Sequence, residues 1–393
     1  MDTNRKIILW SMLHSLVLLM ACYWLWNLPY AFDDEAASIR WFNTCRQYFD
    51  QSEKADQHLL LVNTAYDRVL VSVVDEYGIP KGNIDITDRE KLLCLLQAAK
   101  ANGNYRYIFL DIYFNPAYST ETDSALFQLI STMPRIVVPC HQDEAGTHEQ
   151  IQHKSALSDY ATSLNEGSFL KYKFLYDKTR KSLPLYAYHE LTGKNIRSCC
   201  GMYFCDGSLC TNSIILDFAV QATNEYTADG EKLIYQLGSD LVDVSTHIDL
   251  PAMMEGRDIL IGDFTENDLH DTVAGTTSGS LINYNAFLAL MNNRHLVSWG
   301  IMATIFLLLC VASYISFSDV QFIDYLPHWK MLKLEWFRFM LTWIGFATIL
   351  TVVCFVFYWM TGKMVDILVI TTYFTLLDTI IASYRIVKNK DKQ

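Results

Sequence analysis

Long apolar stretches flank one large segment of mixed character along this chain. The stretches lie at 7–26, 297–317, 337–360 and 365–384. Each approaches or exceeds the roughly 20 apolar residues that a helix needs to cross a bilayer. The segment at 27–296 mixes apolar and polar positions, which is typical of a soluble domain. The pattern therefore predicts four transmembrane helices, a large domain between the first and the second, and a short tail at 385–393.

Within the large segment, the run RYIFLDIYFNP at 106–116 ends on polar residues and a Pro break. A continuous apolar run of this length predicts a central strand covered on both faces. Strands are also predicted at 68–78 and 135–139, and helices at 87–103 and 121–133. This alternation predicts a parallel βαβαβ core with right-handed crossovers.

The second half of the segment is less regular. A polar loop is predicted at 146–166 and a two-stranded ribbon around Asp177. Further strands are expected at 212–220 and 257–264, before a helix at 280–293 that runs into the second span. The expected fold class is α/β, with a mixed sheet around the parallel core, plus four transmembrane helices.

Basic residues near the apolar stretches set the expected orientation. They lie before the first stretch, between the second and third, and after the fourth, as Arg5, Lys6, Lys330, Lys333, Arg338, Arg385, Lys388, Lys390 and Lys392. Positively charged loops stay in the cytoplasm. Both termini are thus expected inside a bacterial cytoplasmic membrane, with the large domain outside. A cleaved signal peptide is the alternative for the first stretch, although its apolar run exceeds the roughly 7–15 residues of such a signal.

Charge and motifs exclude several function classes. The formal net charge of −12 disfavours nucleic acid as a partner. The run GTTSGS at 275–280 lacks the spacing of a phosphate loop, and no nucleophile elbow or HExxH motif is present. Cys140, His141, His148 and His153 are spread over a polar loop without metal-ligand spacing. We therefore expect no enzyme, no cofactor and no metal site.

Four of the ten cysteines crowd into the run SCCGMYFCDGSLC as Cys199, Cys200, Cys205 and Cys210. An external compartment permits disulfides, so one or two local bridges are expected. Close cysteine pairs also suit a zinc site, but this run lacks a standard paired CxxC spacing.

Three carboxylates are candidates for one site. Asp75 and Asp111 stand at predicted strand ends, and Asp271 lies in the loop after a later strand. Side chains at the carboxyl edge of an α/β sheet converge where ligands tend to bind, so this group can take a cation, a sugar hydroxyl or an amine. The alternative is that these residues cap helices and tie loops.

Two ionisable residues lie within predicted spans. His14 and Asp378 each stand about seven residues from a cytoplasmic helix end, which places both roughly 10 Å deep. We expect a direct or water-bridged pair between them, because ionisable groups in lipid need a partner. The alternative is that each binds nearby hydroxyl groups or another subunit.

The order of elements resembles the CHASE type 2 family of extracytoplasmic sensor domains, which usually sit between one membrane span and three more. FLDIYFNP resembles the family's second strand, with Asp111 and Phe114 in place, and RVLVSVVDEYG resembles its opening strand. Residues matching its closing pattern are Asp271, Gly279, Asn285 and Ala286. The resemblance adds Asn285 to the candidate ligand cleft. Leu281 and Asn283 depart from the family, in which an acidic residue and a His are common there.

The resemblance implies a domain that senses a small molecule or protein outside the membrane. Relatives often continue into a catalytic output domain, whereas this chain stops at Gln393. We therefore expect signalling through the membrane helices to a separate partner subunit, or within a homo-oligomer. The alternative is a structural or assembly subunit of a cell-envelope complex, which binds a partner protein through the ribbon near Asp177.

Overall fold

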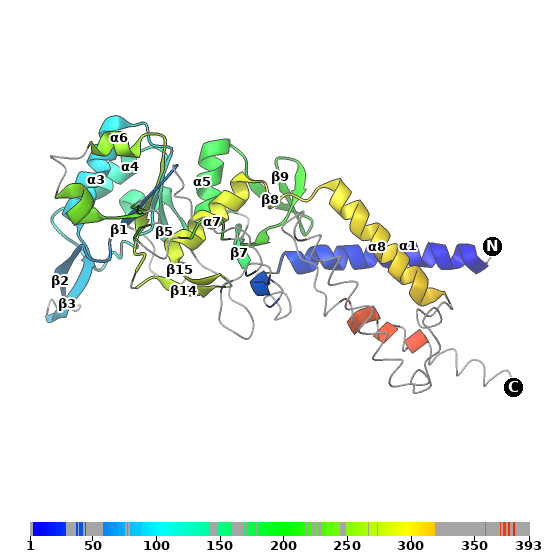
Figure 1. The fold of residues 1–393 in the computed structure, drawn as a ribbon. Helices are drawn as coiled ribbons and strands as arrows, with labels where there is room; N and C mark the ends of the chain where they lie inside the picture. The colour runs from blue at the N-terminus through cyan, green and yellow to red at the C-terminus, as the bar shows by residue number, and fades with distance from the viewer. Residues whose placement is uncertain are drawn as a thin grey trace.

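The computed structural model describes residues 3–28, 58–74, 79–141, 148–158, 171–177, 179–216, 218–221, 232–243, 249–265, 267–272 and 274–318. It also describes positions 37, 39–41, 44, 77, 169, 225–226, 230, 358, 370, 372–374, 376–377 and 380–381. An α/β domain forms one end of the molecule. Two long helices, α1 (Thr3–Trp26) and α8 (Trp299–Phe317), extend from it side by side (Figure 1).

The centre of the domain is a sheet in the strand order β12-β1-β13-β4-β5-β6. Its strands are β1 (Leu59–Asn63), β4 (Tyr107–Leu110), β5 (Ile136–Cys140), β6 (Ser155–Leu157), β12 (Ile234–Gln236) and β13 (Asp258–Gly262). Every pairing within it is parallel. The α/β class is thus confirmed, with a parallel central sheet. Among the described strands, antiparallel pairing occurs only in separate small sheets, so the mixed sheet that was predicted is not seen there.

The predicted central strand is β4, which is shorter than the run that predicted it. All four of its residues are fully buried, because helices cover both faces of the sheet. Tyr107 and Phe109 point into the core beneath α5 (Leu183–Thr192) and α7 (Gly279–Met291). Ile108 and Leu110 point into the opposite core, beneath α3 (Arg89–Asn102) and α4 (Asp123–Thr132). This alternation follows from the two-residue period of a strand.

Helix α3 begins and ends close to the predicted positions. Asp88 is the N-cap residue, and its carboxylate accepts from the backbone N–H groups of Glu90 and Lys91. Gly103 ends the helix in the left-handed region, with φ 67°, as predicted. The same face of the sheet carries the short helices η1 (Glu149–Lys154), η2 (Leu237–Val242) and α6 (Leu250–Met254).

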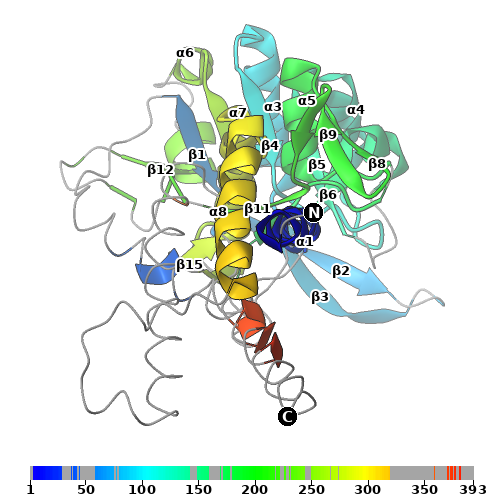
Figure 2. The same cartoon turned by 90° about the vertical axis from the view of Figure 1, so that its right-hand side faces the viewer.

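The stretch predicted as the opening strand of the sheet lies elsewhere. β2 (Arg68–Val74) pairs antiparallel with β3 (Pro80–Thr87) in a ribbon that projects from the domain (Figures 1 and 2). The first sheet strand is β1, with the sequence LLLVN, whose last four residues are buried. β2 instead exposes Leu70 by 72%. A strand buried on both faces needs the unbroken apolar run that β1 has.

Small sheets complete the domain. They are formed by β7 (Lys171–Lys173) with β11 (Ser213–Ile215), by β8 (Ile196–Cys199), β9 (Met202–Cys205) and β10 (Ser208–Cys210), and by β14 (Leu269–Thr272) with β15 (Gly275–Ser278). The predicted loop at 146–166 contains η1 and β6. Of the ribbon predicted around Asp177, the structure shows one bridge, between Leu175 and Lys181.

The four clustered cysteines are not bridged to one another. Cys199 and Cys200 are exposed, with their sulfurs 3.8 Å apart. Cys205 and Cys210 are buried on β9 and β10, where they lie opposite Ser208 and Tyr203. Because the register places neither opposite a second cysteine, the predicted local bridges are absent from the described structure.

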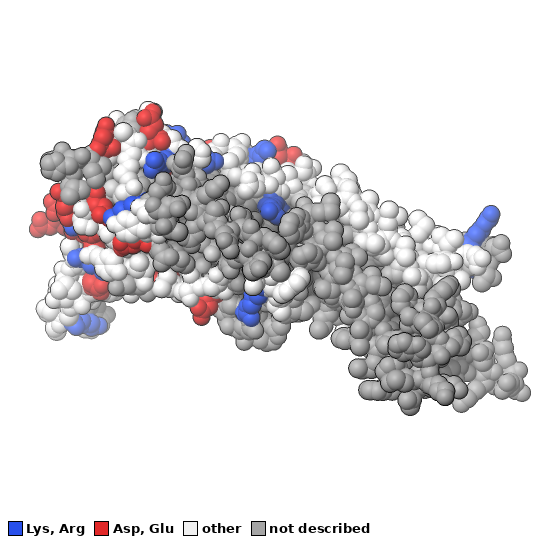
Figure 3. All heavy atoms as spheres, viewed as in Figure 1, with Lys and Arg blue, Asp and Glu red and all other residues white. Residues whose placement is uncertain are grey.

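Helices α1 and α8 are long and apolar enough to cross a membrane. Figure 3 shows them without charged side chains between the domain and the basic N-terminal end of α1. They pack where Ser15 Oγ lies 3.1 Å from Ser313 Oγ, since small residues allow close approach of two helices. These helices match two of the four predicted spans. The stretches at 337–360 and 365–384 lie almost wholly outside the described residues.

Candidate functional site

A cleft of about 570 Å³ lies along the carboxyl edge of the central sheet. Five adjacent strands each end directly before a polar residue that lines it. These residues are Thr64 after β1, Asp263 after β13, Asp111 after β4, His141 after β5 and Ser158 after β6. Parallel strands all point the same way, so the residues that follow them gather at one edge.

The cleft also lies where the chain connections change direction. After β4 the chain passes to α4, on the face covered by α3. After the neighbouring strand β13 it passes through β14 and β15 to α7, on the opposite face. Connections that leave adjacent strand ends toward opposite faces open a crevice, where ligands of open α/β sheets bind.

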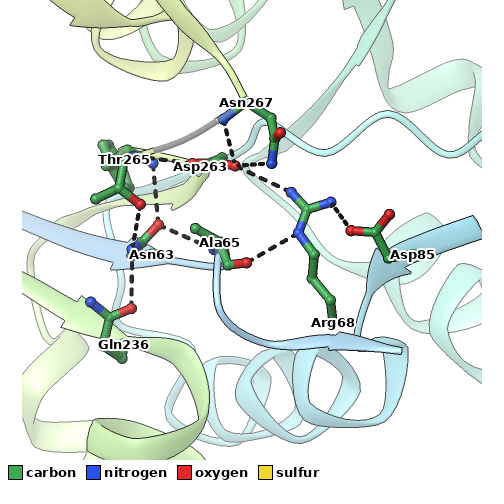
Figure 4. A network of polar contacts seen from close by, with 9 residues as sticks. Asn63, Ala65, Arg68, Asp85, Gln236, Asp263, Thr265 and Asn267 are labelled. Atoms are coloured by element: carbon green, nitrogen blue, oxygen red, sulfur yellow. Dashed lines mark hydrogen bonds and ion pairs between the residues drawn. The ribbon is translucent and has the colours of Figure 1, made fainter. Parts of the chain in front are cut away.

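One wall of the cleft is an arginine network at the base of the β2–β3 ribbon (Figure 4). Arg68 forms ion pairs with Asp85 on β3, at 3.3 Å, and with Asp263, at 3.2 Å. Asp263 also accepts from the backbone N–H and the side-chain amide of Asn267, both at 3.1 Å. These bonds tie the projecting ribbon to the end of β13.

A second arginine lies at the start of α3. Arg89 is 3% exposed, and its guanidinium is 2.9 Å from the carboxylate of Asp123, the first residue of α4. The guanidinium also lies 4.9 Å from the centre of the Phe114 ring, a cation–π contact. Burial lowers the pKa of Arg89, and the charge of Asp123 opposes that effect. The pair fixes the first turns of two helices beside the cleft.

Asp111 is the carboxylate at the centre of the cleft edge. Its Oδ2 accepts a hydrogen bond of 3.1 Å from the side-chain amide of Asn283, on α7. The same amide donates to Ser158 Oγ at 2.9 Å, and its carbonyl oxygen accepts from Tyr172 at 2.6 Å. A residue on the far face of the sheet thereby reaches the cleft.

The pKa of Asp111 is raised to about 7. Burial is the largest cause, and the negative charge of Asp268 acts in the same direction. Asn283, Ser280 and His141 act in the opposite direction, because each favours the ionised carboxylate. Asp111 therefore changes charge near neutral pH.

Two histidines line the cleft near these carboxylates. His270 Nε2 lies 3.0 Å from Asp268 Oδ1, and this bond raises the pKa of His270, with further help from the charges of Asp268 and Asp111. His141 packs edge-on against the ring of Tyr113, with 5.3 Å between ring centres. The arrangement offers ionisable groups but no nucleophile paired with a base among the described residues.

Of the four predicted cleft residues, the structure places one in the cleft. Asp111 lines it. Asp271 is exposed on β14, away from the cleft lining, and its backbone carbonyl accepts from Phe169. Asn285 is buried on α7, where its side chain bonds both the N–H and the carbonyl of Val220. Asp75 lies outside the described residues.

Sequence reasoning missed Asn283, Arg68 and the residues that follow β1, β5, β6 and β13. One signal was available for the residues that follow these strands, since each comes at the end of a short, mostly apolar segment. Asn283 carried no such signal, because it occupies a fully buried position on a helix that is predominantly apolar.

Within the apolar helices, His14 bonds to hydroxyl groups. Its Nδ1 lies 2.8 Å from Ser313 Oγ, on α8, and its Nε2 lies 2.5 Å from the hydroxyl of Tyr373. Hydroxyl partners were the alternative to the predicted pair with Asp378, which lies outside the described residues.

Among the described residues, one short segment of the domain, the junction segment 209–212, bonds both to the end of α1 and to the linker before α8. Tyr23, near the end of α1, donates to the carbonyl of Cys210 at 2.8 Å, and Asn27 accepts from the N–H of Asn212 at 2.7 Å. The linker between α7 and α8 binds the same segment. Val297 N donates to the carbonyl of Leu209 at 2.9 Å, and the N–H of Thr211 donates to the carbonyl of His295 at 2.8 Å.

Comparison of the chain with protein-family models, curated proteins and solved structures finds no match. Within the described residues, no group of three His, Cys, Asp or Glu side chains is arranged to hold a metal ion.

Proposed function

We propose that the protein is an integral membrane sensor whose α/β domain binds a small ligand in the cleft and transmits the event through α7 to α8. The observation that carries the proposal is the bond between Asn283 and Asp111. It joins the ligand-facing edge of the sheet to the helix that leads into an apolar, membrane-length helix.

The path from the cleft to α8 is short. Asn283 lies in the second turn of α7, and α7 is followed after seven residues by α8. The first turn of α7 also packs against the sheet, because Ser280 lies directly over Gly262, where a Cβ atom would collide with its hydroxyl. A ligand that changes the hydrogen bonds of Asp111 thus acts on the start of a helix whose other end is the linker to α8.

The junction segment 209–212 supports the second half of the proposal. It bonds both to the end of α1 and to the linker before α8. A shift of α7 is therefore passed to the contact between α1 and α8. A two-state change of this kind needs a ligand with different affinity for the two arrangements.

The layout of the chain supports a sensor of the CHASE type 2 kind in a bacterial cytoplasmic membrane. The order of apolar and mixed segments resembles that of the family, and basic residues favour cytoplasmic termini with the domain outside. The receiver of the signal would be a separate partner subunit or a second copy of the chain.

The test measures distances between spin labels in the full-length chain, reconstituted in lipid nanodiscs. Labels are placed at Leu9 and Tyr314, both exposed and near the ends of α1 and α8 farthest from the domain. Non-natural amino acids spare the native thiols. The control pair is Trp24 and Trp299, exposed at the ends nearest the domain. A small-molecule library is screened first by thermal stabilisation.

A stabilising ligand is expected to change the Leu9–Tyr314 distance distribution. The same ligand should bind an Asn283→Leu variant without changing that distribution, since the variant lacks the bond to Asp111. An unchanged distribution in the parent chain at saturating ligand would refute the relay.

The projecting ribbon favours a second candidate function, an assembly subunit that binds a partner protein. Leu70, Tyr77 and Ile79 on or near β2 and β3 are exposed by 72%, 80% and 60%. The earlier candidate near Asp177 is less suitable, because its carboxylate closes a tight turn with Thr179 and Arg180. Replacing Leu70 and Ile79 by Ser should abolish co-purification of such a partner, and unchanged co-purification argues against this role.

A further inference from the structure

The charges around the cleft indicate which ligand it suits. Arg68 is already paired with Asp85 and Asp263, and Arg89 is already paired with Asp123. An anionic ligand would therefore compete with carboxylates that already neutralise the charge of each guanidinium. Binding of an anion would also add negative charge beside Asp111 and Asp268.

Asp111, by contrast, forms no ion pair with any residue that the structure describes. Burial and the charge of Asp268 together raise its pKa to about 7. The charged groups that face it are Asp268, His141 and His270, and His270 is hydrogen-bonded to Asp268. Two carboxylates, Asp111 and Asp268, thus face the centre of the cleft, and the nearby cationic side chain, His270, is bonded to Asp268 rather than to Asp111.

An inorganic cation is a poor ligand for these two carboxylates. Hard divalent cations take six or more oxygen ligands, roughly, or a tight set of carboxylates. Among the described residues, no three His, Cys, Asp or Glu side chains are grouped so that they could hold a metal ion. The volume of about 570 Å³ instead suits a small organic molecule, and the rings of Tyr113 and Tyr118 line the same space. Aromatic rings attract organic cations as well as covering their apolar parts.

We propose that the cleft binds an organic cation, a primary amine whose ammonium group is held by Asp111 with the support of Asp268. This inference rests on the proposed ligand-binding role of the cleft and names the class of ligand. A neutral sugar would satisfy hydrogen bonds but would leave the repulsion between the two carboxylates in place, whereas an ammonium group relieves it.

Binding of an ammonium group favours the ionised form of Asp111. Because the pKa of Asp111 is raised to about 7, about half of the molecules hold its proton at pH 7. The amine therefore releases about half a proton per molecule bound at this pH. Affinity falls as pH is lowered from 8 to 5, by about tenfold or more. When His270, whose pKa is raised by Asp268, is protonated, its positive charge also disfavours the ammonium group.

The test compares three four-carbon probes at constant ionic strength, with the full-length chain in nanodiscs: 1,4-diaminobutane, 1,4-butanediol and butanedioate. Isothermal titration in two buffers of different ionisation enthalpy gives both affinity and proton release. The diamine is expected to bind, to release protons at pH 7, and to bind at least about tenfold more tightly than the diol or the dicarboxylate.

Three variants locate the binding. Asp111→Asn should weaken diamine binding by about tenfold or more and abolish proton release. Asp268→Asn should also weaken diamine binding. Because Asp268 is partly exposed, this variant replaces Asp111→Asn as the test if Asp111→Asn folds poorly. Asp271→Asn is the matched control, since Asp271 is an exposed carboxylate of the same region outside the cleft.

Preferred binding of the diol or dicarboxylate overturns the proposal, as does equal loss in the Asp271→Asn control. Failure of the diamine and of shorter and longer amines to bind overturns it too. The spin-label experiment separates this outcome from the sensor function. If a neutral ligand changes the Leu9–Tyr314 distance, the ligand class is wrong but the relay stands. If the amine binds at Asp111 without changing that distance, the ligand class stands and the relay fails.

Discussion

The side-chain amide of Asn283 donates a hydrogen bond of 3.1 Å to Asp111. Asp111 follows the sheet strand β4, whereas Asn283 lies on α7, a helix that covers one face of the sheet. The bond exists because β13 ends in Gly262, which lets the first turn of α7 lie close against the strand. One buried amide therefore connects the cleft to a helix outside it.

Removal of this amide should destabilise the domain. In the Asn283→Leu variant, Asp111, Ser158 and Tyr172 each lose the hydrogen bond that they form with Asn283. We expect a loss of about 1–3 kcal/mol in the free energy of unfolding, measured by urea denaturation. Tyr172→Phe removes only the donor to the Asn283 carbonyl and should cost about 1 kcal/mol. Equal stability of Asn283→Leu and the parent chain would contradict this role.

The raised pKa of Asp111 predicts a pH-dependent stability. A carboxyl group whose pKa is higher in the folded state stabilises the fold below its ordinary pKa of 3.8, and this contribution is lost as pH rises through about 7. Asp111→Asn removes the effect. Relative to the parent chain, the variant should gain about 2 kcal/mol between pH 5 and pH 9, after allowance for solvent access. Urea denaturation at both pH values measures the difference.

The control for this experiment is Asp271→Asn, at an exposed position. Its stability relative to the parent chain should change little over the same pH interval. A pH dependence of Asp111→Asn that matches the parent chain would show that Asp111 does not titrate near neutrality.

Gly262 should not tolerate a side chain. A Cβ atom there would collide with Ser280 Oγ and lie 3.2 Å from Ser280 Cβ. Gly262→Ala should cost about 1–3 kcal/mol of stability. A second change, Ser280→Gly, should restore part of the loss, which a double-mutant cycle measures. Gly300→Ala is the control, because its nearest neighbour would be Ser298 Oγ at 3.8 Å. If the stability effects of Gly262→Ala and Ser280→Gly are simply additive, the two side chains do not collide.

His14 should help to hold the apolar helices together. His14→Leu removes the bonds to Ser313 and Tyr373. In bicelles we expect the chain to lose about 1 kcal/mol of resistance to denaturant. A double-mutant cycle with Tyr373→Phe should give a coupling of about 0.5–1 kcal/mol. Leu16→Ala, at an exposed position on α1, is the control. A coupling of zero would mean that the bond to Tyr373 contributes nothing.

Local pattern predicted the regular part of the fold. The apolar run of β4, the apolar run of β5 and the Gly103 stop of α3 all lie where the sequence placed them. β1 and β2 were confused because both are short and rich in β-branched or aliphatic residues. The unbroken apolar run of β1 favours burial on both faces, but the run of β1 is only four residues long, and the pairing of each strand depends on distant segments.

The candidate site was predictable in part for a similar reason. Asp111 follows the most apolar strand of its region, so its position at the sheet edge could be inferred. Asn285 and Asn283 lie two residues apart on α7, yet only Asn283 reaches the cleft. Two positions on a helix differ by about 200° around its axis, and the packing of α7 on the sheet decides which side faces Asp111.

In the proposed relay, the junction segment 209–212 would be the pivot of the two long helices. It bonds to the end of α1 and to the linker directly before α8. The 19 residues of α8 extend about 28 Å at 1.5 Å per residue. A tilt of about 5° around that fulcrum would sweep the far tip of α8 by about 2.5 Å. A small rotation of α8 next to the domain would thus become a displacement of a few ångströms at its far end.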